Sequence, residues 1–164
     1  MAEQIINQEY LQSIFEYKDG ELFWKQNRRT NQVKGKKAGC LGGIGYLQTK
    51  INDVLYKNHR LIFMMHYGYL PKLLDHIDGN PTNNRIENLR EATVAQNMMN
   101  SKMALNNTSG TKGVEWNKRL KKWTVRIQID GKRKYFGSYY DIKVAKFVGE
   151  IMRHKYHGKF ARHV

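Results

Sequence analysis

The chain has 164 residues, of which 40% are hydrophobic, and it carries a formal net charge of +15 at pH 7. This apolar content is enough to build packed cores, which excludes a disordered basic tail. The excess of Lys and Arg favours a polyanionic partner, with nucleic acid as the first candidate and an anionic membrane surface as the second.

Membrane and disulfide signals are missing from the sequence. No apolar run approaches the roughly 20 residues that a membrane span needs, and residues 1–10 lack the basic and apolar regions of a secretory signal. The single cysteine, Cys40, excludes an internal disulfide and a cysteine-rich zinc site. These features predict a cytoplasmic protein with no membrane partner.

Positive charge is concentrated in the last third of the chain. Residues 1–104 hold 14 Lys and Arg against 10 Asp and Glu, whereas residues 105–164 hold 15 against 4. The segment 100–113 between them is rich in Asn, Ser and Gly, a composition typical of an exposed connection. We therefore predict an α+β protein with two domains, 1–104 and 105–164.

Local signals predict several short elements in the first domain. QEYLQSIF favours a short helix, and FEYKDGELFWK favours a hairpin that turns at Asp19-Gly20. Alternation from Leu47 to Ile51 predicts a strand, and the next turn is at Asn52-Asp53. NHRLIFMMHYG then predicts an apolar helix that ends at Gly68.

The stretch LDHIDGNPTNNRIENLREATVAQN, residues 74–97, carries the strongest chemical signal. Its adjacent Asp75 and His76 suit metal-assisted phosphodiester hydrolysis, because a carboxylate can bind Mg²⁺ and an imidazole can take a proton from water near neutral pH. The Asp, Gly, Asn and Pro that follow predict a loop. NLREA could return as a strand, and Thr93 fits as the N-cap of a helix that begins VAQNMMN.

A polar surface loop with no catalytic role is the alternative for this stretch. Asp75 and His76 are neighbours on a predicted strand, where successive side chains point to opposite faces. They can serve one reaction if the metal and the attacking water lie on different sides of the scissile phosphate. The spaced asparagines on a basic chain favour the catalytic interpretation.

Together these residues resemble the ββα-metal site of HNH endonucleases, most closely the phage intron-encoded homing enzymes. The resemblance runs through NHRLIFMMHYGYLP and LLDHIDGNPTNNRIENLREAT to the final QN. It implies that His76 is the general base and that Asp75 and Asn97 bind Mg²⁺ or Mn²⁺. It also implies that Asn88 braces the metal loop and orients His76. Asn97 stands where many HNH enzymes have a second histidine, which leaves the preferred metal open.

The second domain has a clearer pattern of three strands and one helix. KGVEWNK predicts a short strand, and KKWTVRIQIDGKRKYFGSYY predicts a hairpin that turns at Asp130-Gly131. Within WTVRIQI, one face holds Trp123, Val125, Ile127 and Ile129, and the other holds Thr124, Arg126 and Gln128. An amphipathic helix follows Asp141, with Ile142, Ala145, Val148 and Met152 on one face and Lys143, Lys146, Glu150 and Arg153 elsewhere. These elements predict a three-stranded antiparallel sheet with one face covered and one face open.

From SGTKGVEWNKRLKKWTVRI through GKRKYFGSY to HGKFA, the second domain resembles the plant APETALA2/ethylene-response-factor type of DNA-binding domain. The resemblance implies that the open sheet face reads double-stranded DNA, where Arg and Gln can bond to base edges. The residues that fall on or beside its DNA-facing strands are Lys112, Arg119, Lys121, Arg126, Gln128, Arg133 and Tyr135. Glu115 and Asn117 stand where plant members often carry arginine, so the target sequence stays open.

The sequence therefore predicts a metal-dependent DNA endonuclease, a phage homing enzyme by resemblance, acting in the host cell cytoplasm. A single active site favours a monomer that nicks one strand. The alternative is a sequence-specific DNA-binding regulator whose nuclease module no longer cuts. An RNA-binding protein is disfavoured, because the open face offers mainly Tyr135 for base stacking.

Overall fold

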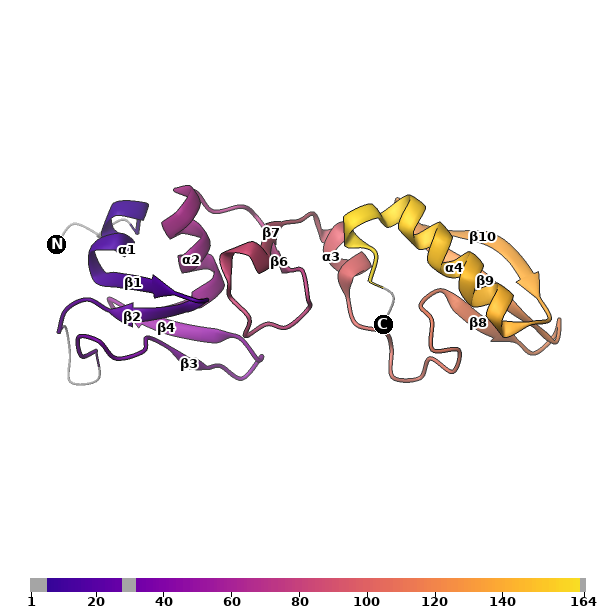
Figure 1. Ribbon diagram of the computed structural model, residues 1–164, viewed down its shortest axis with the longest axis horizontal. Helices are drawn as coiled ribbons and strands as arrows, with labels where there is room; N and C mark the ends of the chain where they lie inside the picture. The colour runs from indigo at the N-terminus through magenta and orange to yellow at the C-terminus, as the bar shows by residue number, and fades with distance from the viewer. Residues whose placement is uncertain (1–5, 28–31, 163–164) are drawn as a thin grey trace. The chain divides into compact units, whose positions relative to one another are not determined.

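The computed structural model describes residues 6–27 and 32–162, and they form two compact units, Met1–Glu91 and Ala92–Val164 (Figure 1). Both units mix short helices with small antiparallel sheets, so the predicted α+β class is confirmed. The units divide between Glu91 and Ala92, whereas the sequence predicted a boundary between residues 104 and 105. Residues 1–5, half of the segment in which we expected no secretory signal, lie outside the described residues.

In its described residues, 6–27 and 32–91, the first unit contains two helices, three small sheets and a 3₁₀ turn. In chain order its elements are α1 (Gln8–Ile14), β1 (Phe15–Lys18), β2 (Glu21–Trp24), β3 (Cys40–Leu41), β4 (Leu47–Ile51), β5 (Val54–Lys57), α2 (Asn58–Tyr67), β6 (Leu74–His76), η1 (Ile86–Asn88) and β7 (Leu89–Glu91). The sheets are β1-β2, β3-β4-β5 and β6-β7, and every pairing is antiparallel.

Local chemistry sets the ends of these elements as the sequence predicts. Asp19 and Gly20 have φ angles of 49° and 87°, and Asn52 and Asp53 have φ angles of 48° and 68°. Two successive residues with positive φ are the requirement of a tight hairpin turn whose twist matches the strands. Gly68 ends α2 in the left-handed conformation, with φ 77°. These turns bring α2 and the β6-β7 hairpin into one unit.

The core of the first unit packs α1 and α2 against the hairpins. Its buried apolar side chains include Leu11, Ile14, Phe15, Leu22, Trp24, Ile51, Leu61, Ile62, Phe63 and Leu89. Leu89 belongs to β7 and is 5% exposed, so the hairpin that carries Asp75 and His76 is anchored in this core.

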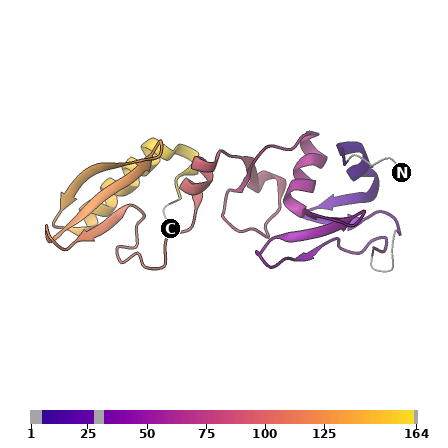
Figure 2. The same cartoon turned by 180° about the vertical axis from the view of Figure 1, so that it is seen from behind.

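The second unit is a three-stranded sheet with one long helix on it. Its elements are α3 (Val94–Asn100), β8 (Val114–Asn117), β9 (Lys122–Ile129), β10 (Lys132–Tyr139), α4 (Ile142–His157) and η2 (Gly158–Phe160), and the strand order is β10-β9-β8. Figures 1 and 2 show α4 lying along one face of this sheet, which leaves the other face open. Val114, Val125, Ile127, Ile129 and Ala145 form the buried core between them.

A glycine lets α4 approach the sheet closely. A Cβ atom on Gly149 would lie 2.9 Å from Cγ2 of Val114, which is too close for a side chain without movement of the strand. Any larger residue at this helix position would therefore separate α4 from β8.

Two polar residues of α4 are buried, contrary to expectation. Arg153, placed away from the packed face by the sequence pattern, is 5% exposed and donates to the carbonyl oxygens of Arg162 at 2.6 Å and Met99 at 3.3 Å. His157 is also buried, and its Nε2 donates to the carbonyl of Gln128 at 2.8 Å. Backbone carbonyls bind one nitrogen of each group, whereas Nε of Arg153 and Nδ1 of His157 have no hydrogen-bond partner among the described residues. A periodicity count cannot reveal such partners.

Candidate functional site

Asp75 and His76 lie on β6 of the β6-β7 hairpin, and both are largely buried from solvent. Asp75 pairs with Arg90 across the hairpin, and His76 pairs with Leu89. Each of the two candidate catalytic side chains is only 5% exposed. Their side chains bind different partners, as expected for neighbours on a strand.

Asp75 takes part in a buried ion pair. Nε of Arg90 donates to Oδ2 of Asp75 at 2.9 Å, and a terminal guanidinium nitrogen lies 2.7 Å from the same oxygen. The side chains of Arg90 and Asp75 are 11% and 6% exposed, so water screens this pair weakly. The arginine fixes the orientation of the carboxylate. This partner was not predicted from the sequence.

His76 is oriented by Asn84, not by Asn88 as the resemblance implied. Nε2 of His76 lies 3.0 Å from Oδ1 of Asn84, which is 1% exposed. An amide oxygen accepts hydrogen bonds, so this contact favours the tautomer in which Nε2 donates, and in that neutral tautomer Nδ1 is the nitrogen that can accept a proton. The arrangement suits a general base that acts through Nδ1.

Asn88 braces the loop between the two strands. Its Oδ1 accepts from the backbone N–H of Asp78 at 3.1 Å, and its Nδ2 donates to Oδ1 of Asp78 at 3.0 Å and to the carbonyl of Asn83 at 2.8 Å. Partial burial raises the pKa of Asp78, but hydrogen bonds from the Asn80 backbone and from the side chains of Asn83 and Asn88 outweigh it and hold the pKa below its ordinary value. The loop is therefore a turn held together by hydrogen bonds to the Asp78 carboxylate.

Two further rings surround His76. The ring centroid of His59, from the first turn of α2, lies 5.0 Å from that of His76 in an edge-to-face arrangement. Tyr46 lies 5.1 Å from His59 and 6.0 Å from His76. Burial, followed by the charges of His76, Lys57 and Arg60, lowers the pKa of His59 to about 3. His59 is therefore neutral near pH 7.

Asn97 lies on α3, in the second compact unit. Thr93 caps this helix through a capping box, in which its side chain accepts from the Gln96 backbone and the Gln96 side chain accepts from the Thr93 backbone. Asn97 is exposed, so its amide oxygen is accessible to a ligand. Among the described residues, no group of three or more His, Cys, Asp and Glu side chains could hold a metal ion. Asp75 of the first unit offers a carboxylate oxygen and Asn97 of the second unit an amide oxygen, and hard cations accept both kinds of ligand.

The open face of the second unit exposes Arg126 and Gln128 as predicted, but Thr124, which the alternation placed with them, is buried and its hydroxyl lies 3.1 Å from that of Ser138. Arg126 and Gln128 project from β9, and their cross-strand neighbours on β10 are Tyr135 and Arg133. These four residues are exposed. An oxygen of Glu115 lies 2.6 Å from the guanidinium of Arg126, so a phosphate or base would compete with this exposed carboxylate. Arg119 and Lys121 are exposed in the turn between β8 and β9.

Lys112 is held differently from the other predicted DNA contacts. Its ammonium donates to the carbonyls of Met99, at 3.1 Å, and Ser101, at the end of α3. Burial, with the nearby Arg153 and Arg162, lowers the pKa of Lys112 to about 8. These contacts hold Lys112 against the end of α3, and its DNA contact stays a prediction.

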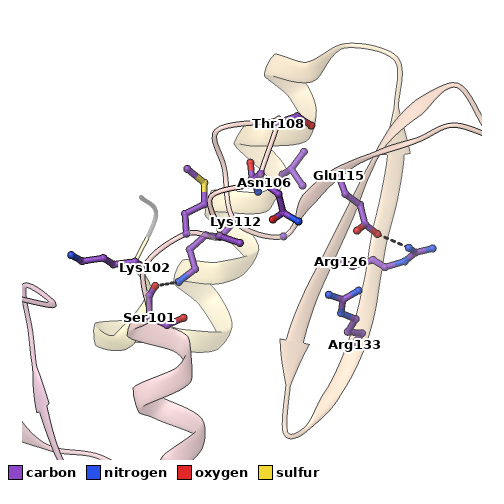
Figure 3. A pocket seen from close by; sticks show the side chains of 13 residues that line it. Ser101, Lys102, Asn106, Thr108, Lys112, Glu115, Arg126 and Arg133 are labelled. Carbon is purple, nitrogen blue, oxygen red and sulfur yellow. Dashed lines mark hydrogen bonds and ion pairs between the residues drawn. The ribbon is translucent and has the colours of Figure 1, made fainter. Parts of the chain in front are cut away.

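Residues of the segment 100–113, which the sequence predicted to be an exposed connection, line one side of a cavity. A cavity of about 490 Å³ lies between residues 101–108 and the strands, and its lining includes the loop residues Lys102, Asn106 and Thr108 (Figure 3). Glu115, Arg126 and Arg133 line it from the sheet. The loop is braced by Ser109, which is 3% exposed and whose hydroxyl lies 2.8 Å from the carbonyl of Val114. Sequence composition alone did not separate this braced loop from a flexible linker.

Comparison with known proteins gives the class of the chain. A family model described as HNH endonuclease matches residues 56–99, a segment that contains α2, β6, β7 and most of α3. The chain therefore carries an HNH endonuclease domain. Protein 3.8 of Escherichia phage T7 is 36% identical to it over 108 residues, which is 65% of this chain and 88% of that protein. This chain belongs to the same family as Protein 3.8.

The family model does not extend into the C-terminal part of the chain. The HNH match ends at residue 99 and gives no support to the APETALA2-like resemblance. No solved structure matches the chain. Across residues 6–27 and 32–162, no helix is long and apolar enough to cross a membrane.

Proposed function

We propose that the protein is a divalent-metal-dependent endonuclease of double-stranded DNA. The observation that carries the proposal is the pair Asp75 and His76, consecutive, shielded and separately oriented inside the HNH segment. A surface loop without catalytic function has no need for a buried carboxylate beside a buried imidazole. Nucleic-acid chemistry also agrees with the net charge of +15.

His76 is the proposed general base. Its Nδ1 takes a proton from the water that attacks the scissile phosphate, while Nε2 remains bonded to Asn84. Asn88 and Asp78 hold the loop that carries Asn84, so the imidazole keeps one orientation during proton transfer.

Asp75 and Asn97 are the proposed metal ligands, from the resemblance and from their oxygen chemistry. Arg90 competes for one oxygen of Asp75, so cation binding involves a rearrangement of this ion pair. A bound Mg²⁺ or Mn²⁺ would offset the negative charge that develops on the leaving 3′ oxygen.

The basic face of the second unit is the proposed DNA-recognition surface. Arg126, Gln128, Arg133 and Tyr135 supply donors that can reach base edges, and Arg119 and Lys121 supply charge for phosphates. The APETALA2-like resemblance of residues 109–161 supports this role. Resemblance to phage homing endonucleases, together with a phage relative, supports action as a monomeric homing enzyme in the host cytoplasm.

Incubation of the intact protein with a long double-stranded DNA tests this function. We expect strand breaks that need Mg²⁺ or Mn²⁺ and stop when the cation is chelated. Tight DNA binding with no breaks in either metal between about pH 6 and 9, a range around the ordinary histidine pKa, would establish the regulator instead.

Replacement of Arg133 by Gln tests the recognition surface. An exposed Arg that contacts a base or phosphate contributes about 1–3 kcal/mol, so we expect DNA affinity to fall by roughly 10–100-fold. Fluorescence anisotropy measures the affinity of each variant for a DNA fragment that contains a site cut by the wild-type protein. Lys143→Gln is the control, because Lys143 is exposed on α4, which covers the opposite sheet face. Equal losses in both variants would show a loss of net charge and no specific contact.

A further inference from the structure

The proposed reaction uses one of three rings that lie together in the first unit. Tyr46, His59 and His76 come from the loop before β4, from α2 and from β6, and their centroids lie 5.0–6.0 Å apart. Lys57 lies over the outer part of this cluster, with Nζ 4.4 Å from the Tyr46 centroid. Neither Tyr46 nor His59 has a place in the proposed chemistry.

His59 has the position of a supporting group. It is 5% exposed, and its edge-to-face contact with His76 is within the range in which aromatic pairs attract each other. It sits in the first turn of α2, a helix whose Leu61, Ile62 and Phe63 are buried in the core. The ring is therefore fixed to a rigid element.

The contacts of His59 and Asn84 with His76 complement each other. Oδ1 of Asn84 lies 3.0 Å from Nε2 of His76 and holds that edge of the imidazole. The His59 ring, whose centroid lies 5.0 Å from that of His76, packs against the imidazole and restricts its rotation about the Cβ–Cγ bond.

We infer that His59 is a positioning residue, whose ring holds the His76 imidazole in the orientation that directs Nδ1 at the attacking water. The inference rests on the proposed role of His76 as general base. Because its pKa is lowered to about 3, His59 places no second cation beside His76 when His76 gains a proton. A misplacement of about 1 Å at a reacting group can reduce a rate by about 10²-fold, which sets the size of the effect.

Two substitutions of His59 separate ring packing from other roles. His59→Leu fills the space without an aromatic ring, and His59→Phe keeps the ring without its nitrogens. We expect His59→Leu to lower the single-turnover cleavage rate by about 100-fold, a loss typical of misorientation, with DNA affinity unchanged. The cleavage rate of His59→Phe should be at most about 10-fold below that of the wild type.

His66→Ala is the matched control. His66 lies on the same helix and also makes an edge-to-face contact, with Tyr17 at 4.6 Å, but it has no such contact with His76. Its cleavage rate should equal that of the wild type. A wild-type rate in His59→Leu, or an equal loss in His59→Leu and His59→Phe, would overturn the inference.

Nitrogen NMR of the His76 ring gives a readout that does not depend on cleavage. In the wild type without DNA we expect one tautomer, protonated at Nε2, and the same signals in His59→Phe. In His59→Leu the ring should show averaged or shifted nitrogen signals. Unchanged His76 signals in a folded His59→Leu variant would refute the positioning role even if the wild type proves unable to cut DNA. If His59→Leu does not fold, His59→Gln replaces it as the variant without a ring.

Discussion

Replacement of His76 by Ala is expected to lower the single-turnover rate of DNA cleavage by about 10²–10⁴-fold, the usual contribution of a general base. The physical reason is the loss of the proposed base, the Nδ1 nitrogen of the imidazole that Asn84 contacts through Nε2. DNA affinity should stay within about twofold, because the proposed binding face lies on β9 and β10.

Thermal melts and a second variant make this result interpretable. His76 is buried, so its removal leaves a cavity that can lower stability. His76→Gln retains much of the volume and a group that can bond to Asn84, but it lacks a basic nitrogen. It should be as slow as His76→Ala. Cleavage at the wild-type rate by a folded His76→Gln variant would exclude His76 as the base.

Replacement of Arg90 by Leu is expected to lower the free energy of unfolding by about 3 kcal/mol at pH 7. Breaking a buried ion pair leaves the remaining charge without its counterion in a poorly hydrated site, which typically costs about 3–5 kcal/mol. The low exposure of both side chains places Asp75 and Arg90 in this class. Urea unfolding of the metal-free protein measures the change.

A double-mutant cycle shows whether the loss belongs to the ion pair. Asp75→Asn together with Arg90→Leu should be less destabilised than the sum of the single variants, because the neutral amide no longer needs a cation. Addition of Mn²⁺ should recover part of the stability of Arg90→Leu alone if Asp75 binds the cation. A loss below about 1 kcal/mol in Arg90→Leu would place the pair among exposed, weak salt bridges.

The sequence predicted those parts of the fold that depend on neighbouring residues. The turns at Asp19-Gly20 and Asn52-Asp53, the helix end at Gly68 and the cap at Thr93 each need only one or two side chains. Strand alternation likewise predicted which residues of β9 pack against α4. Backbone conformation and local hydrogen bonds determine these features, so a short window of sequence contains the information.

Partners brought together by strand register or by loop folding escaped prediction. Arg90 reaches Asp75 only because β6 and β7 pair in one register, and Asn84 looked like one more asparagine in a turn. Arg153 was counted as a surface cation, since its carbonyl partners lie on distant segments. For the same reason the sequence predicted the two candidate catalytic side chains but not the groups that orient them.

Analysis of the ends made on a long DNA tests the proposed reaction most directly. Attack of water on the phosphate with departure of the 3′ oxygen predicts breaks that carry a 3′ hydroxyl, which a DNA polymerase extends without prior treatment. These breaks should require Mg²⁺ or Mn²⁺ and should disappear in His76→Ala, which still binds the DNA. DNA that stays intact while the wild-type protein is bound to it in the presence of either metal would contradict the assignment.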